Sequence, residues 1–199
     1  MSKDFWNSRY SEQEFAYGTQ PNAFLKQGLE KIKSGTALFL GEGEGRNAVY
    51  AATLGWQVDA VDFSSSAKVK ALKLAEKNNV KINYEVFDLN EYGFKENYYD
   101  LVVMIFLHLP LELREKVFKN SINSLKSNGI LLAEAFNKNQ INNSSGGPQS
   151  LDLLYSENDV LGLVKDLRTE TIETKSIELD EGEYHKGKAD VIRYVGVKS

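Results

Sequence analysis

The sequence predicts an α/β fold in which a mostly parallel sheet is covered by helices on both faces. Short apolar runs and helical patterns alternate through most of the chain, and this alternation is typical of a parallel sheet. The first apolar run, Ala37–Leu40, ends in a glycine turn, and the second run ends in Asp62. A glycine turn between a strand and a helix is a further sign of a doubly wound sheet.

Five apolar runs are expected to form the core strands, near Ala37–Leu40, Val58–Asp62, Asn83–Phe87, Leu101–Phe106 and Ile130–Phe136. Helical patterns lie before and between them, and we expect helices at Asn22–Lys33, Arg46–Leu54, Ser66–Lys77 and Leu111–Leu125. Gly35 ends the first helix, and Ser127-Asn128-Gly129 ends the last, because glycine commonly follows a helix terminus.

The last third of the chain is different in character. Asn137–Ser150 is polar and contains glycine, so we expect a mobile loop there. Ser156 is a candidate cap for a short helix reaching about Leu167, since acidic residues at positions 157 and 159 favour a helix amino end. Two closing strands are expected near Thr171–Glu178 and Ala189–Val197.

Composition excludes several classes of function. The chain has 199 residues, and 28 acidic against 24 basic residues give a net charge of −4, which argues against a nucleic-acid partner. There is no cysteine, hence no disulfide and no thiolate ligand or nucleophile. The amino terminus lacks an apolar signal core and no apolar run is long enough to span a bilayer, so we expect a cytoplasmic protein without a membrane partner, either a monomer or a weak homodimer.

The glycine turn and Asp62 together indicate a site for a nucleotide-like ligand. Gly41, Gly43 and Gly45 let the backbone approach a ligand closely, and the amino end of the next helix faces it. Asp62, at the end of the second strand, is placed to accept both ribose hydroxyls. The plainer alternatives are a glycine-rich turn that binds nothing and a solvated acid at a strand end.

The spacing of the glycines narrows the choice of ligand. A dinucleotide fingerprint, G-x-G-x-x-G, would need its third glycine where this chain has Arg46. A phosphate-binding P-loop would need lysine followed by Ser or Thr, and neither follows Gly45. The observed G-x-G-x-G spacing, with the acid on the second strand, resembles the cofactor loop of class I S-adenosylmethionine (AdoMet) methyltransferases.

The resemblance extends beyond this loop. WNSRY at Trp6–Tyr10 and FAYGTQPNAFL at Phe15–Leu25, followed by GEGEGRNAVYAA, are similar to the tellurite-resistance and thiopurine methyltransferase-like group. This resemblance implies a Rossmann-like class I fold, with a mostly parallel seven-stranded sheet and an antiparallel closing strand, and AdoMet as cofactor. It also implies one methyltransferase domain over residues 1–199: a lid and helix at 1–34, the AdoMet-binding core at 35–136, and a substrate-side loop and closing hairpin at 137–199.

One departure from the family pattern concerns the methionine end of the cofactor. The family usually carries an acid two residues before the first glycine, where this chain has Phe39. Glu42 and Glu44 lie inside the loop instead, and either is a candidate to pair with the amino group of AdoMet. The sequence does not decide between them.

The resemblance also implies further cofactor contacts. Asp88 would lie near the adenine amino group and the Leu89 N–H near the ring, although Asp88 or Asn90 would serve equally well as a helix cap. Residues after the fourth strand would pack on the cofactor, or else lie in the core, and the aromatic amino-terminal tract would form a lid or pack on the sheet edge. The candidate cofactor-binding residues are Trp6, Arg9, Tyr17, Gly41, Glu42, Gly43, Gly45, Asn47, Asp62, Phe63, Ser64, Asp88, Leu89, Ile105 and Phe106.

The catalytic requirements are small. Methyl transfer from a sulfonium is an in-line displacement that depends mainly on positioning, so a soft acceptor such as a thiol, selenium or tellurium species needs no strong base. An oxygen or nitrogen acceptor would need one, and His108 and Tyr17 are the first candidates, although a lone histidine is often structural. His185 lies in a polar turn interpreted as a solvated hairpin tip, and the two histidines form no evident metal site.

The sequence therefore predicts an AdoMet-dependent methyltransferase with a small-molecule acceptor. Two alternatives stay open: a non-catalytic AdoMet-binding regulatory protein, and a nucleotide-dependent oxidoreductase. Methyl transfer to candidate acceptors would separate the enzyme from the first, and binding of NADH would favour the second.

Overall fold

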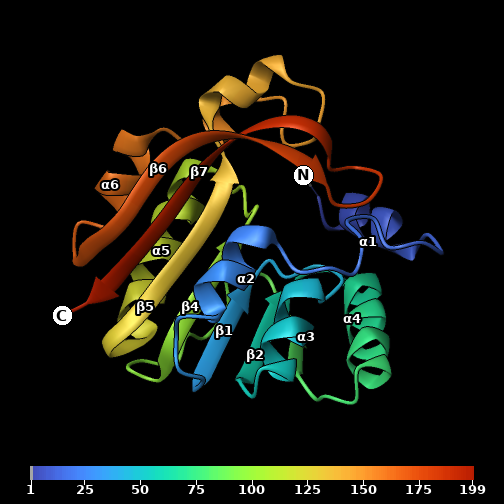
Figure 1. The fold of residues 1–199 in the computed structure, drawn as a ribbon, viewed down its shortest axis with the longest axis horizontal. Coiled ribbons are helices and arrows are strands. Elements are labelled where there is room, and N and C mark those ends of the chain that lie inside the picture. The colour runs from blue at the N-terminus through green and yellow to red at the C-terminus, as the bar shows by residue number, and fades with distance from the viewer. Residues whose placement is uncertain (1) are drawn as a thin grey trace.

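A computed structural model describes residues 2–199 of the chain. Its centre is a seven-stranded sheet with the strand order β3-β2-β1-β4-β5-β7-β6 (Figure 1). The strands are β1 (Thr36–Leu40), β2 (Gln57–Asp62), β3 (Asn83–Val86), β4 (Tyr99–Ile105), β5 (Leu125–Phe136), β6 (Leu167–Asp180) and β7 (Lys186–Lys198). The first five pair in parallel, and β7 is antiparallel to both of its neighbours. The predicted fold class is confirmed.

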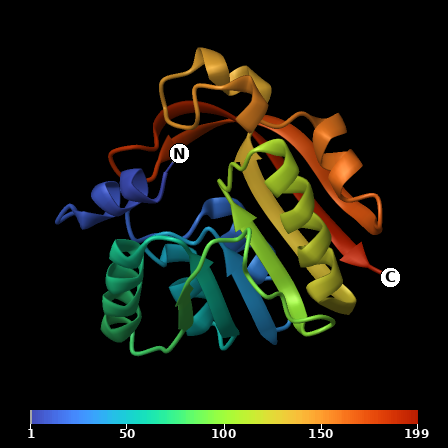
Figure 2. The ribbon, with the colours of Figure 1, turned by 180° about the vertical axis from the view of Figure 1, so that it is seen from behind.

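Helices cover both faces of this sheet. They are α1 (Lys3–Ser11), α2 (Ala23–Leu29), α3 (Arg46–Thr53), α4 (Ser65–Lys77), α5 (Leu111–Ser124) and α6 (Glu157–Leu163), together with the short 3₁₀ helices η1 (Lys138–Asn142) and η2 (Leu151–Leu153). Figure 1 shows α2 and α3 in front of the sheet, and the reverse view in Figure 2 brings α5 to the front.

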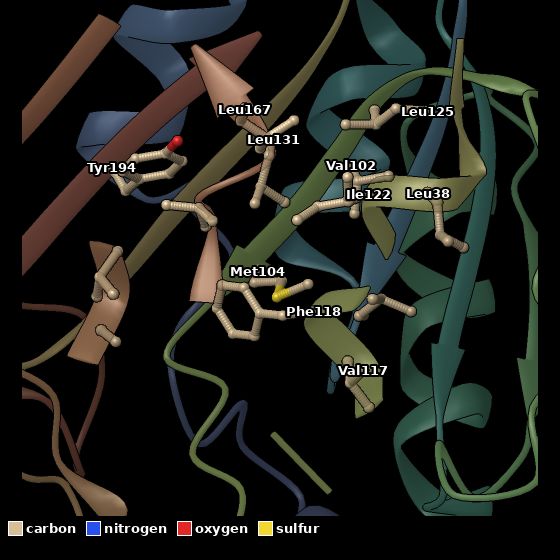
Figure 3. Packing of buried hydrophobic residues seen from close by; sticks show 14 of the residues in the cluster. Leu38, Val102, Met104, Val117, Phe118, Ile122, Leu125, Leu131, Leu167 and Tyr194 are labelled. Carbon is tan, nitrogen blue, oxygen red and sulfur yellow. The ribbon is translucent and has the colours of Figure 1, made fainter. Parts of the chain in front are cut away.

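The alternation of side chains along the central strands separates two cores. Leu38, Val102 and Met104 point to the side covered by α5, where they pack with Phe118 and Ile122 of that helix (Figure 3). The intervening residues of β1 and β4 point to the other face and pack beneath α2 and α3. Because both faces are buried, these strands read as continuous apolar runs, as parallel strands do.

The structure corrects several predicted boundaries. The amino-terminal tract forms a helix, α1, capped by the Ser2 side chain, which accepts from Phe5 N. Helix α2 ends at Leu29, short of Lys33, and α6 ends at Leu163 because Val164 leaves the helical conformation. The boundary errors are of the usual kind, since helix ends are decided by a few local hydrogen bonds.

Two other segments differ from the sequence prediction. Ser127-Asn128-Gly129 does not simply stop α5: β5 already begins at Leu125, and these residues form an irregular stretch of its pairing with β4, with Asn128 at φ 65°. Asn137–Ser150 is partly ordered, because its first residues form η1 and the Gln140 side chain donates to Ser145 Oγ and Gly146 O.

Three segments gather above the carboxyl ends of the parallel strands. Figures 1 and 2 both show helix α1, the 137–155 segment and the turn between β6 and β7 at this edge. The edge is where a parallel α/β sheet presents its ligand site. Among the described residues, the helices are too short or too polar to cross a membrane.

Candidate functional site

A cavity of about 440 Å³ opens at this carboxyl edge. It is lined by the glycine loop, by the residues that follow β2, β3 and β4, by α1, and by the turn between β6 and β7. Most of the predicted cofactor-binding residues line it: Trp6, Arg9, Tyr17, Gly41, Glu42, Gly43, Asn47, Asp62, Phe63, Asp88, Leu89, Ile105 and Phe106. The topology thus brings together residues from well-separated parts of the chain.

Asp62 joins the glycine loop to the end of β2. Its Oδ2 accepts from Gly43 N at 3.0 Å, and its Oδ1 accepts from Ser64 N at 2.9 Å. Loss of hydration raises the pKa of this buried carboxyl to about 6, against the effect of those two backbone donors. Each carboxylate oxygen can still accept a second hydrogen bond, so the group remains able to bind two ribose hydroxyls.

Glu42 caps helix α3 from inside the loop. Its Oε1 accepts from the backbone N–H groups of Asn47 and Ala48 at 3.0 and 2.8 Å, a role that the helix's own cap residue, Gly45, cannot fill. Its other carboxylate oxygen makes no hydrogen bond among the described residues, and the side chain lines the cavity. Desolvation raises the pKa of Glu42 to about 8, so the group is largely protonated at neutral pH.

Glu44 has a different role. Its Oε1 pairs with Lys70 Nζ at 2.6 Å, and its Oε2 accepts from Ala16 N at 2.8 Å. Both oxygens therefore tether the amino-terminal tract and α4 to the glycine loop. Of the two acids that the sequence left open, Glu42 is the one with acceptor capacity left toward the cavity.

Two of the predicted cofactor-binding residues lie behind the cavity wall. Gly45 adopts φ 88° and lies so close to α4 that an added Cβ would be 2.8 Å from Ala71 Cα. Its glycine identity is thus required by helix packing. The Ser64 hydroxyl caps α4 by accepting from Ala67 N, and donates to Asn7 Oδ1, so it supports Asp62 and α1 from behind.

Helix α1 closes one side of the cavity with aromatic side chains. Trp6 stacks on Tyr10 at 5.3 Å, and Tyr10, which belongs to the aromatic tract but is not among the candidate cofactor-binding residues, also lines the cavity. Arg9 donates to the Tyr17 hydroxyl at 2.9 Å and its guanidinium lies 4.0 Å from the centre of the Tyr184 ring. Arg9 is therefore held among aromatic rings. These contacts keep the amino-terminal tract over the cavity.

His108 lines the cavity, but both of its ring nitrogens lie against backbone groups. Its Nδ1 lies 2.8 Å from Leu153 O and its Nε2 accepts from Phe136 N at 3.4 Å, so both ring nitrogens are used by the backbone. Burial lowers the pKa of His108 to about 4, and the ring stays neutral. This geometry argues against the predicted role as a base. Tyr17 is a poor base as well, because burial raises the pKa of its hydroxyl and Arg9 occupies the oxygen.

His185 is the residue that sequence reasoning underestimated. The turn that carries it folds inward, so the ring is buried, lines the cavity, and lies 4.4 Å from Tyr17 and 4.6 Å from Phe106. Its Nδ1 lies 3.3 Å from Glu181 Oε2, and burial lowers the pKa of the ring. A neutral ring that donates from Nδ1 leaves an unprotonated Nε2. The alternation of Glu181, Glu183 and His185 was the one available signal.

Glu181 fixes the turn to the amino end of α3. It pairs with Arg46 at 2.9 Å, and Arg46 is the residue that stands where a dinucleotide-binding loop has glycine. Although burial works in the opposite direction, the hydrogen bond from His185 and the charge of Arg46 lower the pKa of Glu181 to about 2. The carboxylate therefore stays ionised and joins the turn between β6 and β7 to the amino end of α3. No cluster of three or more potential metal ligands occurs among residues 2–199.

Comparison with known proteins agrees with this geometry. Residues 37–129 match the family described as "Methyltransferase domain". Over 85 residues, 42% of the chain, 33% are identical to the probable S-adenosyl-L-methionine-dependent methyltransferase TehB of Haemophilus influenzae. Over 92 residues, 28% are identical to Hemagglutinin 1 of Eikenella corrodens. The chain spans 29% and 31% of the length of these two relatives, respectively.

Solved structures show the same fold. That of TehB from Haemophilus influenzae has a TM-score of 0.76 at 21% identity, covering 99% of this chain and 67% of the other. A protein that converts a disulfide bond into a thioacetal group during echinomycin biosynthesis has a TM-score of 0.81 at 14% identity, with 99% and 92% covered. The N-methyltransferase NodS from Bradyrhizobium japonicum, bound to S-adenosyl-L-homocysteine, has a TM-score of 0.74 at 12% identity, with 98% and 97% covered.

The strand order, the glycine loop with Asp62 and the matched domain make the chain similar to the class I S-adenosylmethionine-dependent methyltransferases. Within this class it resembles the tellurite-resistance methyltransferases represented by TehB. The cofactor of the class, S-adenosylmethionine, fits the donors and acceptors of the cavity: a ribose acceptor in Asp62 and a free carboxylate oxygen in Glu42.

The first prediction concerns the packing role of Gly45 in the glycine loop. Gly45→Ala should lower the free energy of unfolding by about 1–3 kcal/mol, because alanine is strained at φ 88° and its Cβ meets Ala71. Gly162→Ala is the matched control: no atom lies within 4 Å of the added Cβ, so the change should be neutral or stabilise α6. Urea denaturation measures the free energy of unfolding of the two variants. Equal stabilities of Gly45→Ala and Gly162→Ala would contradict the packing role of Gly45.

Proposed function

We propose that the protein transfers a methyl group from AdoMet to a compact small-molecule acceptor. The observation that carries this proposal is Asp62, held by Gly43 N and Ser64 N at the mouth of a glycine loop without phosphate-binding features. When bound, AdoMet supplies an electrophilic methyl group. The chain supplies the acceptors for ribose and amino groups, a cavity that excludes bulk water, and a helix lid.

The residues divide between the two ends of the cavity. Asp88 and Leu89 follow β3 and are proposed to receive the adenine, with Ile105 beside them. Glu42, at the amino end of α3, is proposed to receive the amino group of the methionine end. Tyr17, Phe106, Phe136 and His185 cluster in the remaining part of the cavity, which we assign to the acceptor.

The charged residues of the cavity and the similarity to TehB support a proposal for the acceptor. A soft nucleophile, such as a thiol, selenium or tellurium species, fits a chamber in which Arg46 is paired with Glu181 and Arg9 donates to the Tyr17 hydroxyl. The similarity to TehB favours this class, whereas neighbours of the same fold include an N-methyltransferase and a [4+2]-cyclase, so the fold alone does not choose. We propose AdoMet-dependent methylation of such a small soft acceptor as the function.

A second candidate is an acceptor that carries an O–H or N–H proton. The observation that favours it is His185, whose Nδ1 is held by Glu181 and whose side chain lines the acceptor part of the cavity. A neutral imidazole in this tautomer can take a proton at Nε2.

The experiment measures methyl transfer from AdoMet to tellurite, selenite, small thiols, phenols and amines, with wild-type protein and with His185→Gln. For a soft acceptor the variant should keep kcat within about threefold, and for an O–H or N–H acceptor kcat should fall by about 10²-fold or more. Transfer to none of the acceptors, with AdoMet still bound, would favour the regulatory alternative.

Asp62→Asn tests the cofactor position. The amide has one oxygen, and its NH2 group cannot accept a hydrogen bond, so the affinity for AdoMet should fall by about tenfold or more, which corresponds to the loss of one or two hydrogen bonds to a charged group. Titration calorimetry measures the affinity, and circular dichroism checks the fold. An unchanged Kd would show that the ribose lies elsewhere, and NADH serves as the competing ligand for the oxidoreductase alternative.

Glu42 makes the binding reaction depend on pH. Its carboxyl, with a pKa of about 8, is largely protonated at pH 7, and pairing with an ammonium group favours the ionised form. AdoMet binding at pH 7 should therefore release close to one proton, and affinity should rise as pH increases toward 8. Calorimetry at pH 7 in buffers of different ionisation enthalpy measures the number of protons released on binding.

Glu42→Gln should abolish the proton release, and Glu44→Gln is the matched control in the same loop. One Glu44 oxygen accepts from Lys70 and the other accepts from Ala16 N. Substitution of Glu44 should therefore loosen the amino-terminal tract, but AdoMet binding should still release a proton. Proton release that disappears with Glu44→Gln and survives Glu42→Gln would reverse the assignment of the two acids.

A further inference from the structure

The acceptor part of the cavity is built around the ring of Phe106. This ring stacks on Phe136 at 4.6 Å with an interplanar angle of 29°, and meets the His185 ring edge-on at 4.6 Å and 74°. Tyr17 completes the cluster from the amino-terminal side, 4.4 Å from His185. The four rings come from four separate parts of the chain, so the chamber exists only in the folded protein.

The backbone of Phe106 is strained. It has φ 54°, in the left-handed region, although it follows directly after the regular strand β4. A bulky aromatic residue is uncommon there, because its Cβ approaches the carbonyl, and glycine would adopt the same conformation freely. The conformation is held by the hydrogen bond that Phe106 N donates to Glu134 O at 2.7 Å. Strain retained at a cavity-lining residue indicates that the ring has a function there.

Two glycines, of which Gly147 lines the cavity, form a wall behind the Phe136 and His185 rings of this chamber. Gly147, at φ 88°, lies against Phe136 so closely that an added Cβ would be 2.7 Å from Phe136 Cδ2. Gly146, at φ 122°, lies equally close to His185, where a Cβ would be 2.8 Å from Cδ2. Their segment is anchored, since Gln140 Nε2 donates to Gly146 O at 2.9 Å and Ser145 Oγ donates to Lys188 O at 2.5 Å. The wall therefore cannot withdraw easily to admit a larger group.

The whole cavity measures about 440 Å³, toward the small end of the range for one drug-sized ligand, about 300–1,000 Å³. A cofactor with adenosine and methionine parts uses most of this space. Little room then remains beside the Phe106 ring.

We propose that Phe106 determines the size of the acceptor: its strained backbone fixes the ring against Phe136 and His185 and restricts the chamber to compact nucleophiles. The assignment rests on the proposed function, because it requires the cofactor to occupy the end of the cavity that contains Asp62. It names Phe106 as a specificity-determining residue, in addition to any contact its ring makes with the cofactor.

The test uses sulfonium analogues of AdoMet, because the substituent on sulfur must enter the acceptor chamber and no acceptor has to be known. Titration calorimetry compares AdoMet with its S-benzyl analogue. Wild-type protein should bind AdoMet at least about tenfold more tightly than the analogue, a discrimination of the size that apolar pockets achieve against added carbon atoms. Phe106→Gly should lower this ratio by about tenfold, and Phe106→Leu, which trims the ring on the same strained backbone, should lower it as well.

Asn128→Gly is the matched control for relief of strain. Asn128 also has a positive φ, 65°, but lies in β5 outside the cavity lining, so this variant should keep the wild-type ratio. The ratio is the readout because removal of the ring can weaken both ligands together.

The outcomes are distinguishable. If Phe106→Leu and Phe106→Gly still bind AdoMet and keep the wild-type ratio of affinities for AdoMet and its S-benzyl analogue, the size assignment is overturned. The proposed function then still stands. Failure of the wild-type protein to bind AdoMet would overturn the proposed function and the assignment with it. If Phe106→Gly fails to fold by circular dichroism, Phe106→Leu alone decides.

Discussion

The site depends on the hydrogen bond between the Asp62 carboxylate and Gly43 N. This bond fastens the glycine loop to the end of β2, and the loop in turn sets the position of α3. A buried carboxylate is costly unless it is paired, and the two backbone donors on Asp62 offset part of that cost. The remaining acceptor capacity faces the cavity, so the interaction that organises the loop also prepares it for a ligand.

The two acids of the glycine loop, Glu42 and Glu44, have different roles around Asp62. Glu42 takes the amino end of α3, which glycine cannot cap with a side chain, and keeps one oxygen for the cavity. Glu44 binds Lys70 and Ala16 N, and so connects the loop to the amino-terminal tract. Phe39, at the usual position of a family acid, is a fully buried core residue. Glu42, which we propose as the replacement for that acid, lies three residues further along the chain, and the sheet keeps its apolar core.

The closing hairpin completes the site through a second buried ion pair. Arg46 and Glu181 join the amino end of α3 to the turn between β6 and β7, and Glu181 also holds His185. Nearby, Asn22 N donates to Asn47 Oδ1, which ties the segment before α2 to the same helix end. The cavity, the segment before α2 and the hairpin are thus coupled at the amino end of α3, so a change in any of them reaches the glycine loop.

The sequence by itself determined the fold class, the cofactor loop and the acid at the end of β2. These follow from local rules: apolar runs make buried strands, three alternating glycines make a close-approach turn, and a strand-end acid must lie at the carboxyl edge. They needed no knowledge of distant contacts, and the predicted strands of the parallel core were right to within a few residues, apart from the earlier start of β5 at Leu125.

The tertiary structure alone decided which candidate residues line the cavity and which serve packing. Gly45 and Ser64 lie behind the wall because α4 packs against it, and His108 is consumed by two backbone groups from the 137–155 region and β5. His185 enters the cavity because the hairpin turn folds inward onto Arg46. Each of these outcomes depends on contacts between residues far apart in the chain, which no local pattern encodes.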